Sequence, residues 1–452
     1  MRPPPSRRQH HAGRAIRSRH SAHPGRAARA PRRGAAGMSP AERAAGPPAP
    51  VPQAPVFDGV RVLEVAQWTF APAAAAVLAD FGASVIKIED PVAGDPQRGL
   101  ASSGVVPSFG GVNIVTAQTN RGKRSVGLNL RDPRGRGLLM ELVDRADVFV
   151  TNFRGPARKR LGFDEDAVRA RNPRIVYARA TGQGPRGEDA DRGGYDFTSY
   201  WMRGGIASAL TAPDADRPLP QPPAFGDKAG AMNLAFGIAA ALFRRERTGE
   251  GALVDVSLLG TALWQHSSAI LYSWGLEREF PVQSGRSANP IARGYRTSDG
   301  RWIALMMIES DRWWPGLCRH VDRPDLVDDE RFADAKARTA NYDACVAELE
   351  SVFAARALAD WRRRFAGFEA PWEVLRTMRE TADDPQVAAN GYAVPVDHDG
   401  TEVRLMSAPV QFDERVPDLT RAPEHAEHSE QVLLELGYDW EAILALKDAA
   451  VL

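Results

Sequence analysis

The segment PPAFGDKAGAM, residues 222–232, places one carboxylate, Asp227, between a proline-rich stretch and a long run of small apolar residues. An aspartate just before a run of helix-forming residues is a preferred N-cap, worth about 1 kcal/mol to the helix. The same position suits a nucleophilic carboxylate, because helix N-terminal amides stabilise its ionised form and negative charge that develops on an attached acyl group. Local grounds favour capping but leave both interpretations of Asp227 open.

Other familiar catalytic patterns do not occur in the chain. It contains no G-x-S-x-G turn, no H-E-x-x-H pair and no G-x-x-x-x-G-K-[ST] loop. The first predicted strand runs into AQWTFAPAA rather than a G-x-G-x-x-G turn, which argues against an NAD-dependent oxidoreductase. The two cysteines, Cys318 and Cys345, provide no disulfide framework and no thiolate metal site. We therefore expect no metal and no resident cofactor.

The elements that position Asp227 are predicted from alternating strand and helix patterns in the sequence. Apolar runs predict strands at 60–66, 83–89, 125–130, 147–153, 174–182 and 252–258, and helices at 72–82, 132–146, 163–172, 227–247 and up to residue 275. Asp132 and Pro133 are typical of an N-cap followed by the first residue of a helix. Strands that alternate with helices imply a parallel sheet with right-handed crossovers. The predicted fold class is α/β.

The later part of the chain has a different pattern, with a hairpin predicted at 295–307, charged helices after it and short strands within 383–412. The predicted organisation has five parts. They are a basic tail at 1–56, a large α/β part at 57–275, a linker at 276–292, a small α+β domain at 293–380 and a C-terminal segment at 381–452.

Charge is distributed unevenly along the chain. Residues 1–57 contain eleven Arg and a single acid, Glu42, and sum to +10, so the rest carries −9 because the total is +1. A mildly acidic body gives no support for nucleic-acid binding. The tail lacks apolar periodicity and is predicted to be disordered, with translation from Met38 favoured over a transit peptide. No apolar stretch reaches the ~18 residues of a membrane span, so we expect a cytoplasmic protein without a membrane partner.

A series of motifs resembles the family III CoA-transferases (CaiB/BaiF family), which include formyl-CoA and carnitine CoA-transferases and α-methylacyl-CoA racemase. The matching stretches are FDGVRVLEVAQWTFAP, LADFGASVIKIEDP, NRGKRSVGLNLRDPRGR, ADVFVTNFRGPARKRLGF, NPRIVYARATGQG, GGYDFTSY, AFGDKAGAMNLAFGIAAALFRRERTGEG and EHSEQVLLELGYDWEAI. In this order they cover about residues 57–452. The resemblance implies a Rossmann-like large domain built from the N- and C-terminal segments, a smaller α+β domain and an interlocked homodimer.

The resemblance also implies functional residues, with Asp227 as the catalytic aspartate and CoA as a substrate rather than a cofactor. It places CoA binding on Trp68, Thr69, Leu128, Arg131, Asn152, Phe153, Arg160 and Leu161, and the thioester pocket on Tyr195 and Asp196. The position after IKIE, an arginine in formyl-CoA transferase, is Asp90 here. Lys87 and Arg98 are therefore the alternatives for contact with the nucleotide end of CoA.

The activity that the resemblance implies is transfer of CoA from an acyl-CoA to a carboxylic acid, through an anhydride and then a thioester on Asp227. A racemase is the alternative, because racemases of this family pair the aspartate with the histidine of a G-H-D motif. Here the motif is Gly194–Tyr195–Asp196, and tyrosine, with a reference pKa of about 10 against about 6.5 for histidine, is a poor proton shuttle. The transferase is favoured, and the presence of Asp227 argues against a non-catalytic CoA-binding homologue.

Overall fold

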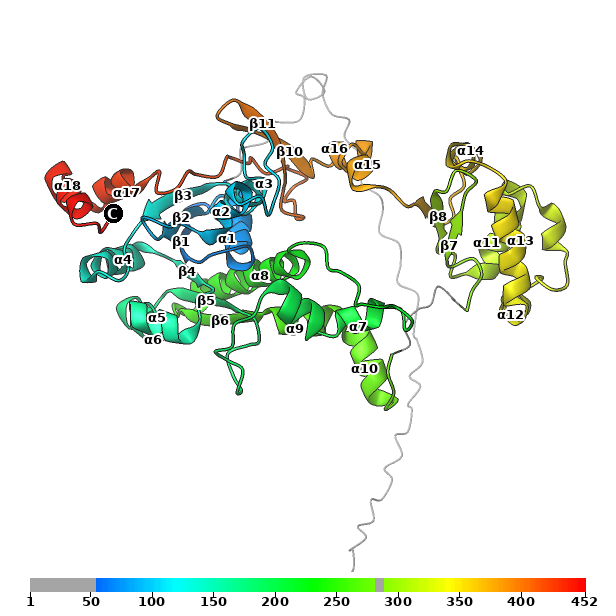
Figure 1. Cartoon of the computed structure of the whole chain (residues 1–452), viewed down its shortest axis with the longest axis horizontal. Coiled ribbons are helices and arrows are strands. Elements are labelled where there is room, and N and C mark those ends of the chain that lie inside the picture. The colour runs from blue at the N-terminus through cyan, green and yellow to red at the C-terminus, as the bar shows by residue number, and fades with distance from the viewer. Residues whose placement is uncertain (1–53, 281–287) are drawn as a thin grey trace, which may run out of the picture. The chain divides into compact units, whose positions relative to one another are not determined.

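The computed structural model describes residues 54–280 and 288–452. The predicted tail at 1–56 lies almost wholly outside the described residues, and so does the middle of the predicted linker at 276–292. The main element is a six-stranded parallel sheet with the order β3-β2-β1-β4-β5-β6 (Figure 1). Its strands are β1 (Arg61–Val65), β2 (Ser84–Glu89), β3 (Lys123–Gly127), β4 (Val148–Thr151), β5 (Val176–Thr181) and β6 (Ala252–Ser257). The predicted α/β class is confirmed.

Two hydrophobic cores lie against the two faces of this sheet. Successive side chains of a strand point to opposite faces, and in β1 Val62 belongs to one core while Leu63 belongs to the other. The first core is closed by α1 (Phe70–Asp80) and α8 (Phe225–Thr248). The second is closed by α4 (Pro133–Arg145), α6 (Glu165–Arg171), α17 (Ser429–Leu436) and α18 (Trp440–Asp448). Residues from the two ends of the described chain therefore share one core.

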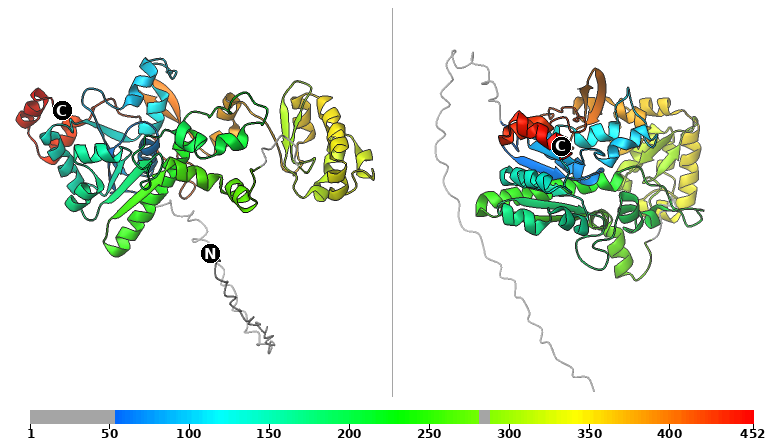
Figure 2. Two further views of the ribbon diagram at one scale, coloured as in Figure 1. Left: turned by 60° about the horizontal axis from the view of Figure 1, so that its bottom comes forward. Right: turned by 60° about the vertical axis from the view of Figure 1, so that its left-hand side comes forward.

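The C-terminal helices show this sharing plainly, because α17 packs beside β3 (Figure 2). Val432 and Leu433 of α17 are buried against the same core as Val126 of β3. The remaining elements before residue 280 are α2 (Gly99–Ser102), α3 (Ile114–Asn120), α5 (Gly155–Leu161), α7 (Ile206–Leu210), α9 (Leu258–Gln265), α10 (Ser267–Gly275), a 3₁₀ turn (Pro96–Arg98) and a π-helical segment (Asp196–Met202). Within the described residues, no helix is long and apolar enough to cross a membrane.

A separate core forms within residues 291–374. It contains the antiparallel strands β7 (Gly294–Arg296), β8 (Trp302–Leu305) and β9 (Trp372–Val374) and the helices α11 (Ser310–His320), α12 (Ala335–Ala340), α13 (Tyr342–Ala354) and α14 (Leu358–Arg364), with a 3₁₀ turn at Pro324–Val327. The hairpin predicted at 295–307 is confirmed as β7 and β8. After this core come α15 (Met378–Ala382), α16 (Pro385–Ala389) and the antiparallel pair β10 (Ala393–His398) and β11 (Thr401–Met406).

Candidate active site

The strand order of the large sheet reverses between β1 and β4, and open parallel sheets bind ligands at the carboxyl ends of the strands on either side of such a point. Gln67 follows the end of β1 and Asn152 follows the end of β4. The N–H of Gln67 donates to Oδ1 of Asn152 at 3.0 Å, and Nδ2 of Asn152 donates to the carbonyl oxygen of Gln67 at 2.6 Å. This reciprocal pair ties together the two loops that leave the sheet at the expected ligand-binding edge.

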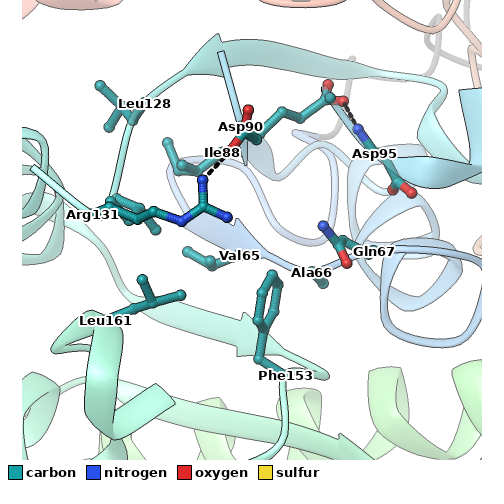
Figure 3. Close-up of a pocket in the computed structure, with 13 residues that line it drawn as sticks. Val65, Ala66, Gln67, Ile88, Asp90, Asp95, Leu128, Arg131, Phe153 and Leu161 are labelled. Carbon is teal, nitrogen blue, oxygen red and sulfur yellow. Dashed lines mark hydrogen bonds and ion pairs between the residues drawn. The ribbon is translucent and has the colours of Figure 1, made fainter. Parts of the chain in front are cut away.

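A first cavity at this edge contains four of the predicted CoA-binding residues. Leu128, Arg131, Phe153 and Leu161 all line it (Figure 3). The guanidinium of Arg131 lies 3.7 Å from the carboxylate of Asp90, which lines the same cavity. Because the side chain of Arg131 is 82% exposed, this ion pair is a weak one. The cavity therefore offers a cation and apolar walls to a ligand, next to the carboxylates of Glu89, Asp90 and Asp95, which also line it.

A second cavity, of about 370 Å³, contains Asp227 together with four other predicted residues, Trp68, Asn152, Phe153 and Tyr195. Phe153 lines this cavity as well as the first one, and so does Gln67. The two cavities therefore adjoin at the carboxyl ends of β1 and β4. Their combined lining brings together eight of the eleven predicted site residues, including Asp227.

The other three predicted residues line neither of these cavities. Thr69 is buried at the start of α1, where its Oγ1 accepts a hydrogen bond from Nε2 of Gln97 at 2.8 Å. Arg160 is an exposed residue in the last turn of α5. Asp196 is buried, and its carboxylate accepts hydrogen bonds from the N–H of Gly226 at 3.0 and 3.2 Å. Asp196 thus holds the start of the helix that carries Asp227. Thr69, next to Trp68, ties that loop to Gln97.

Lys87 and Arg98, the expected alternatives to Asp90, both have other partners. Lys87 is fully buried, and its ammonium lies 2.8 Å from Glu64 and 2.9 Å from Asp95. Arg98 donates to both carboxylate oxygens of Glu89, at 2.8 and 2.7 Å. Neither side chain lines the first cavity. A lysine buried between two carboxylates cannot reach a ligand, so the expectation fails for Lys87 on physical grounds.

Asp227 is the third residue of α8 and not its N-cap. The N-cap position is Ala224, in the left-handed region with φ 56°, and no side chain of that residue caps the helix. The carboxylate that accepts from the first turn belongs to Asp196, about thirty residues upstream. The capping interpretation of Asp227 is therefore wrong, because a distant side chain has taken that role.

Close packing brings the first turns of α8 against the π-helical segment and against α1. A Cβ on Gly226 would lie 2.2 Å from Cγ of Tyr200, and a Cβ on Gly230 would lie 2.6 Å from Cε2 of Phe70. The hydroxyl of Tyr200 donates to Oε1 of Gln265 at 2.5 Å, which holds the ring in place. Glycine is required at both positions because any side chain would push α8, and Asp227 with it, out of the cavity wall.

The electrostatic setting of Asp227 favours its neutral form. Burial, together with the nearby carboxylate of Asp196, raises the pKa of Asp227 to about 7, although Lys228 acts in the opposite direction. Burial also raises the pKa of Asp196 above its ordinary value, against hydrogen bonds from Gln221 and the backbone amides at the start of α8. The expectation that the helix N-terminus keeps Asp227 ionised is therefore wrong: the amides serve Asp196.

The loop after β1 carries Trp68 in an unusual conformation. Its φ of 67° lies in the left-handed region, which costs a residue other than glycine about 1–3 kcal/mol unless its surroundings enforce it. The N–H of Trp68 donates to Oδ1 of Asp95 at 3.0 Å. The ring meets Tyr195 edge to face, with centroids 5.9 Å apart. Asp95 and Tyr195 thus fix an aromatic wall beside Asp227.

Several polar residues that line these cavities were missing from the predicted site, among them Gln67, Arg154 and Arg192. Gln67 lies two residues after the end of β1, and Arg154 directly follows the predicted residue Phe153. The rule that ligands bind where the strand order reverses could therefore have found both. Arg192 lies in the loop between β5 and the π-helical segment. No local pattern indicates which residue of a loop will face a cavity.

Comparison with known proteins shows the family to which the chain belongs. Residues 57–429 match the family described as CoA-transferase family III. The chain is 30% identical to (R)-2-hydroxy-4-methylpentanoate CoA-transferase from Clostridioides difficile, over 88% of this chain and 99% of that protein. It is 32% identical to succinate–glutarate CoA-transferase from Agrobacterium fabrum, over 84% of this chain and 96% of that protein. A crystal structure of a CAIB/BAIF family protein from Brucella suis superimposes with a TM-score of 0.74 and 29% identity, covering 85% of this chain and 100% of that one. The resemblance in the sequence is thus confirmed, and the chain belongs to CoA-transferase family III and is a CoA-transferase.

Proposed function

We propose that this enzyme moves CoA from an acyl-CoA thioester to a carboxylic acid and that Asp227 is the nucleophile. The observation that carries the proposal is the position of Asp227, in a cavity that adjoins the one lined by Arg131. The nucleotide end of CoA then occupies the cavity with Arg131, whose guanidinium suits phosphate groups. The pantetheine arm passes Gln67 and Phe153, which line both cavities, and its thioester comes to lie at Asp227.

In the proposed mechanism, an oxygen of the Asp227 carboxylate attacks the thioester carbonyl, the C–S bond breaks and CoA leaves as the thiolate. The thiolate then attacks the aspartyl carbonyl of the resulting anhydride, which releases the donor as a carboxylate and leaves an aspartyl-CoA thioester. The acceptor carboxylate repeats the two steps in reverse order and leaves with CoA. A carboxylate nucleophile is suitable because its anhydride is as activated as the thioester that it replaces.

The amides at the start of α8 do not serve this chemistry in the way the sequence suggests. Backbone hydrogen bonds from Phe225, Gly226 and Asp227 are directed at Asp196. They therefore position α8, and donors for the tetrahedral oxyanion have to come from other groups at the cavity. The close packing of Gly226 on Tyr200 limits movement of Asp227 away from the thioester.

A racemase remains the second candidate, because it would use the same aspartate. Racemisation at the α-carbon needs a second acid–base group opposite the first. Tyr195 stands at that position of the motif, its side chain is 62% exposed and its ring packs on Trp68. A phenol with a reference pKa of about 10 is a poor general base at neutral pH. Tyr195 therefore supports CoA transfer over racemisation.

The test uses the purified full chain with acetyl-CoA or succinyl-CoA as donor and a panel of acids that includes succinate, glutarate, butyrate and 2-hydroxy-4-methylpentanoate. We expect mass spectrometry to detect a new acyl-CoA that depends on the acid. A parallel reaction holds a 2-methylacyl-CoA in D₂O without any acid. Deuterium entering the α-carbon there, with no CoA transfer in the panel, would replace the transferase with the racemase.

The pH dependence of the reaction follows from the raised pKa of Asp227, which is about 7. The nucleophile is the ionised carboxylate, and a group with that pKa is about one tenth ionised at pH 6 and about nine tenths ionised at pH 8. We therefore expect kcat/KM to rise about tenfold between pH 6 and pH 8. Initial rates over this interval measure it, and a profile that is flat from pH 6 upward would mean that Asp227 is already ionised or is not the attacking group.

We also propose the interlocked homodimer and two-domain layout that the resemblance implies. Large apolar side chains are exposed on α8, α9 and α10, among them Phe236 at 75%, Trp264 at 76% and Trp274 at 78%, and exposed groups of this kind are typical of subunit contacts. The separate core within residues 291–374 supports a smaller domain. Sedimentation at the 49.2 kDa mass of one chain would contradict the dimer.

A further inference from the structure

A third cavity adjoins the one that contains Asp227, on a side that neither the CoA path nor the nucleophile uses. Arg192 and Gly193 line both cavities, so the two meet at these residues. Gln183, Thr198 and Met202 complete much of the lining of the third cavity. The cavities lined by Arg131, by Asp227 and by Thr198 are thus consecutive, each sharing residues with the next. The site extends beyond what a CoA thioester of a very small acid would fill.

Arg192 is the cation at the junction, and it shares its partner, Asp189, with Arg203, which contacts the other carboxylate oxygen. The carboxylate of Asp189 lies 2.5 Å from the guanidinium of Arg203 but 3.7 Å from that of Arg192. The hydrogen bond from Arg203 is the first cause of the lowered pKa of Asp189. The side chain of Arg192 is 67% exposed and makes no closer ion pair within the described residues. Its planar fork of N–H donors therefore remains available to an incoming carboxylate.

The charges around Asp227 make a cation at this place useful. Asp227 lines this cavity, so an acid that enters while Asp227 is ionised meets a negative charge. The cations that line it are Arg154 and Arg192. Arg154 donates to the carbonyl oxygen of Asp191 at 3.5 Å and lines the second cavity without lining the third. Arg192 lies at the junction with the third cavity, where the far end of an acyl group would extend.

We infer that Arg192 binds a second carboxylate on the acyl group, so that the preferred acid is a short dicarboxylic acid with one carboxylate at Asp227 and the other at the junction with the third cavity. This inference rests on the proposed function. A monocarboxylic acid of the same length places a methyl group beside the guanidinium and gains nothing from it. The matched pairs succinate and butyrate, and glutarate and valerate, differ in that one group.

Steady-state kinetics with acetyl-CoA as donor test the inference directly. The wild type is expected to have a KM for succinate about two- to fivefold below that for butyrate, because an ion pair at a largely exposed arginine changes affinity by about that factor. Arg192→Gln should remove most of that difference and leave the KM for acetyl-CoA unchanged. Arg186→Gln is the matched control, since Arg186 is an exposed arginine of the same loop that lines none of the three cavities. Equal KM values for the two acids in the wild type, or a preference that survives Arg192→Gln, would overturn the inference while leaving CoA transfer intact.

A second measurement does not depend on turnover. Phenylglyoxal modifies accessible guanidiniums, and peptide mass spectrometry reports the rate at Arg192 and at Arg186 separately. We expect succinate to slow modification of Arg192 severalfold, butyrate to have little effect and neither acid to protect Arg186. Protection of Arg154 alone would assign the second carboxylate to that residue and refute the role of Arg192, and the result holds whether or not any acid of the panel is turned over.

Discussion

Replacing Asp227 with Asn should abolish CoA transfer and leave the fold intact. The amide has nearly the size of the carboxylate but cannot attack the thioester, so no anhydride forms, and loss of a covalent nucleophile typically costs a thousandfold or more in kcat (about 10³ to 10⁶). Turnover of acetyl-CoA and an acid, followed by mass spectrometry, measures the loss. The matched control is Asp214→Asn, because Asp214 is an exposed carboxylate outside the three cavities.

The same variant has an expected effect on stability with a definite sign. In the unfolded chain an aspartate loses its proton near pH 4, whereas Asp227 in the folded protein keeps it until about pH 7. Between these values the folded state binds more protons, so the stability of the wild type falls as the pH rises from about 4 to about 7. Asn carries no such proton. We expect Asp227→Asn to be more stable than the wild type by about 1 to 4 kcal/mol at pH 8 and to lose this advantage near pH 4.

Together these outcomes separate catalysis from folding. If Asp227→Asn is inactive but more stable than the wild type at pH 8, the lost carboxylate served catalysis and destabilised the folded protein, as active-site groups often do. A variant that is inactive because it unfolds would instead melt earlier at every pH. Full activity in Asp227→Asn would refute the nucleophile assignment outright.

Replacing Lys87 with Ala should destabilise the whole large sheet. The ammonium lies 2.8 Å from Glu64 and 2.9 Å from Asp95, and all three side chains are essentially inaccessible to solvent. Burial by itself lowers the pKa of Lys87, but the two carboxylates outweigh it and hold the pKa above its ordinary value. Glu64 keeps a second partner, Lys123, at 2.6 Å, but Asp95 loses its buried partner, and an uncompensated buried charge costs about 3 to 5 kcal/mol. Urea unfolding, with the midpoint as readout, measures the effect.

The Lys87 variant also has a local consequence at the site. Asp95, which loses its partner, accepts the N–H of Trp68 and so holds the left-handed turn beside Asp227. We expect the tryptophan fluorescence of the folded variant to shift from that of the wild type. Lys159→Ala is the control, because Lys159 is exposed on α5, and such a change usually alters stability by less than about 0.5 kcal/mol. Equal midpoints for the wild type and Lys87→Ala would contradict the structural role of the network.

The sequence predicts the large sheet well because each strand is an apolar run between turn residues. The six strands and the helices α1, α4, α6 and α8 all occur, with end shifts of up to three residues. β9, with three residues, is too short to carry a period, and α5 consists of the largely basic segment GPARKRL, which has no apolar period. The π-helical segment at Asp196–Met202 has no sequence signal of its own, since it depends on packing against α8.

Three of the predicted site residues lie near the ends of regular elements, and the structure brings them together. Asp227, Trp68 and Asn152 follow or begin regular elements, and all three line one cavity. The prediction failed where a partner distant in sequence decides the outcome. Asp196, and not Asp227, accepts the hydrogen bond from the first turn of α8. Lys87 of β2 is buried in an ion pair with Glu64 of β1. Such pairings follow from strand register and loop packing, which local pattern does not contain.

The covalent role of Asp227 can be observed directly. Acetyl-CoA is mixed with the enzyme in the absence of an acceptor acid, hydroxylamine is added, and peptides are sequenced by mass spectrometry. An activated aspartyl carbonyl reacts with hydroxylamine to give a hydroxamate, while a free carboxylate does not. We predict the hydroxamate on Asp227, only when acetyl-CoA is present, and on no other acidic residue. A hydroxamate on a different aspartate or glutamate, or none under conditions in which CoA transfer proceeds, would contradict the mechanism.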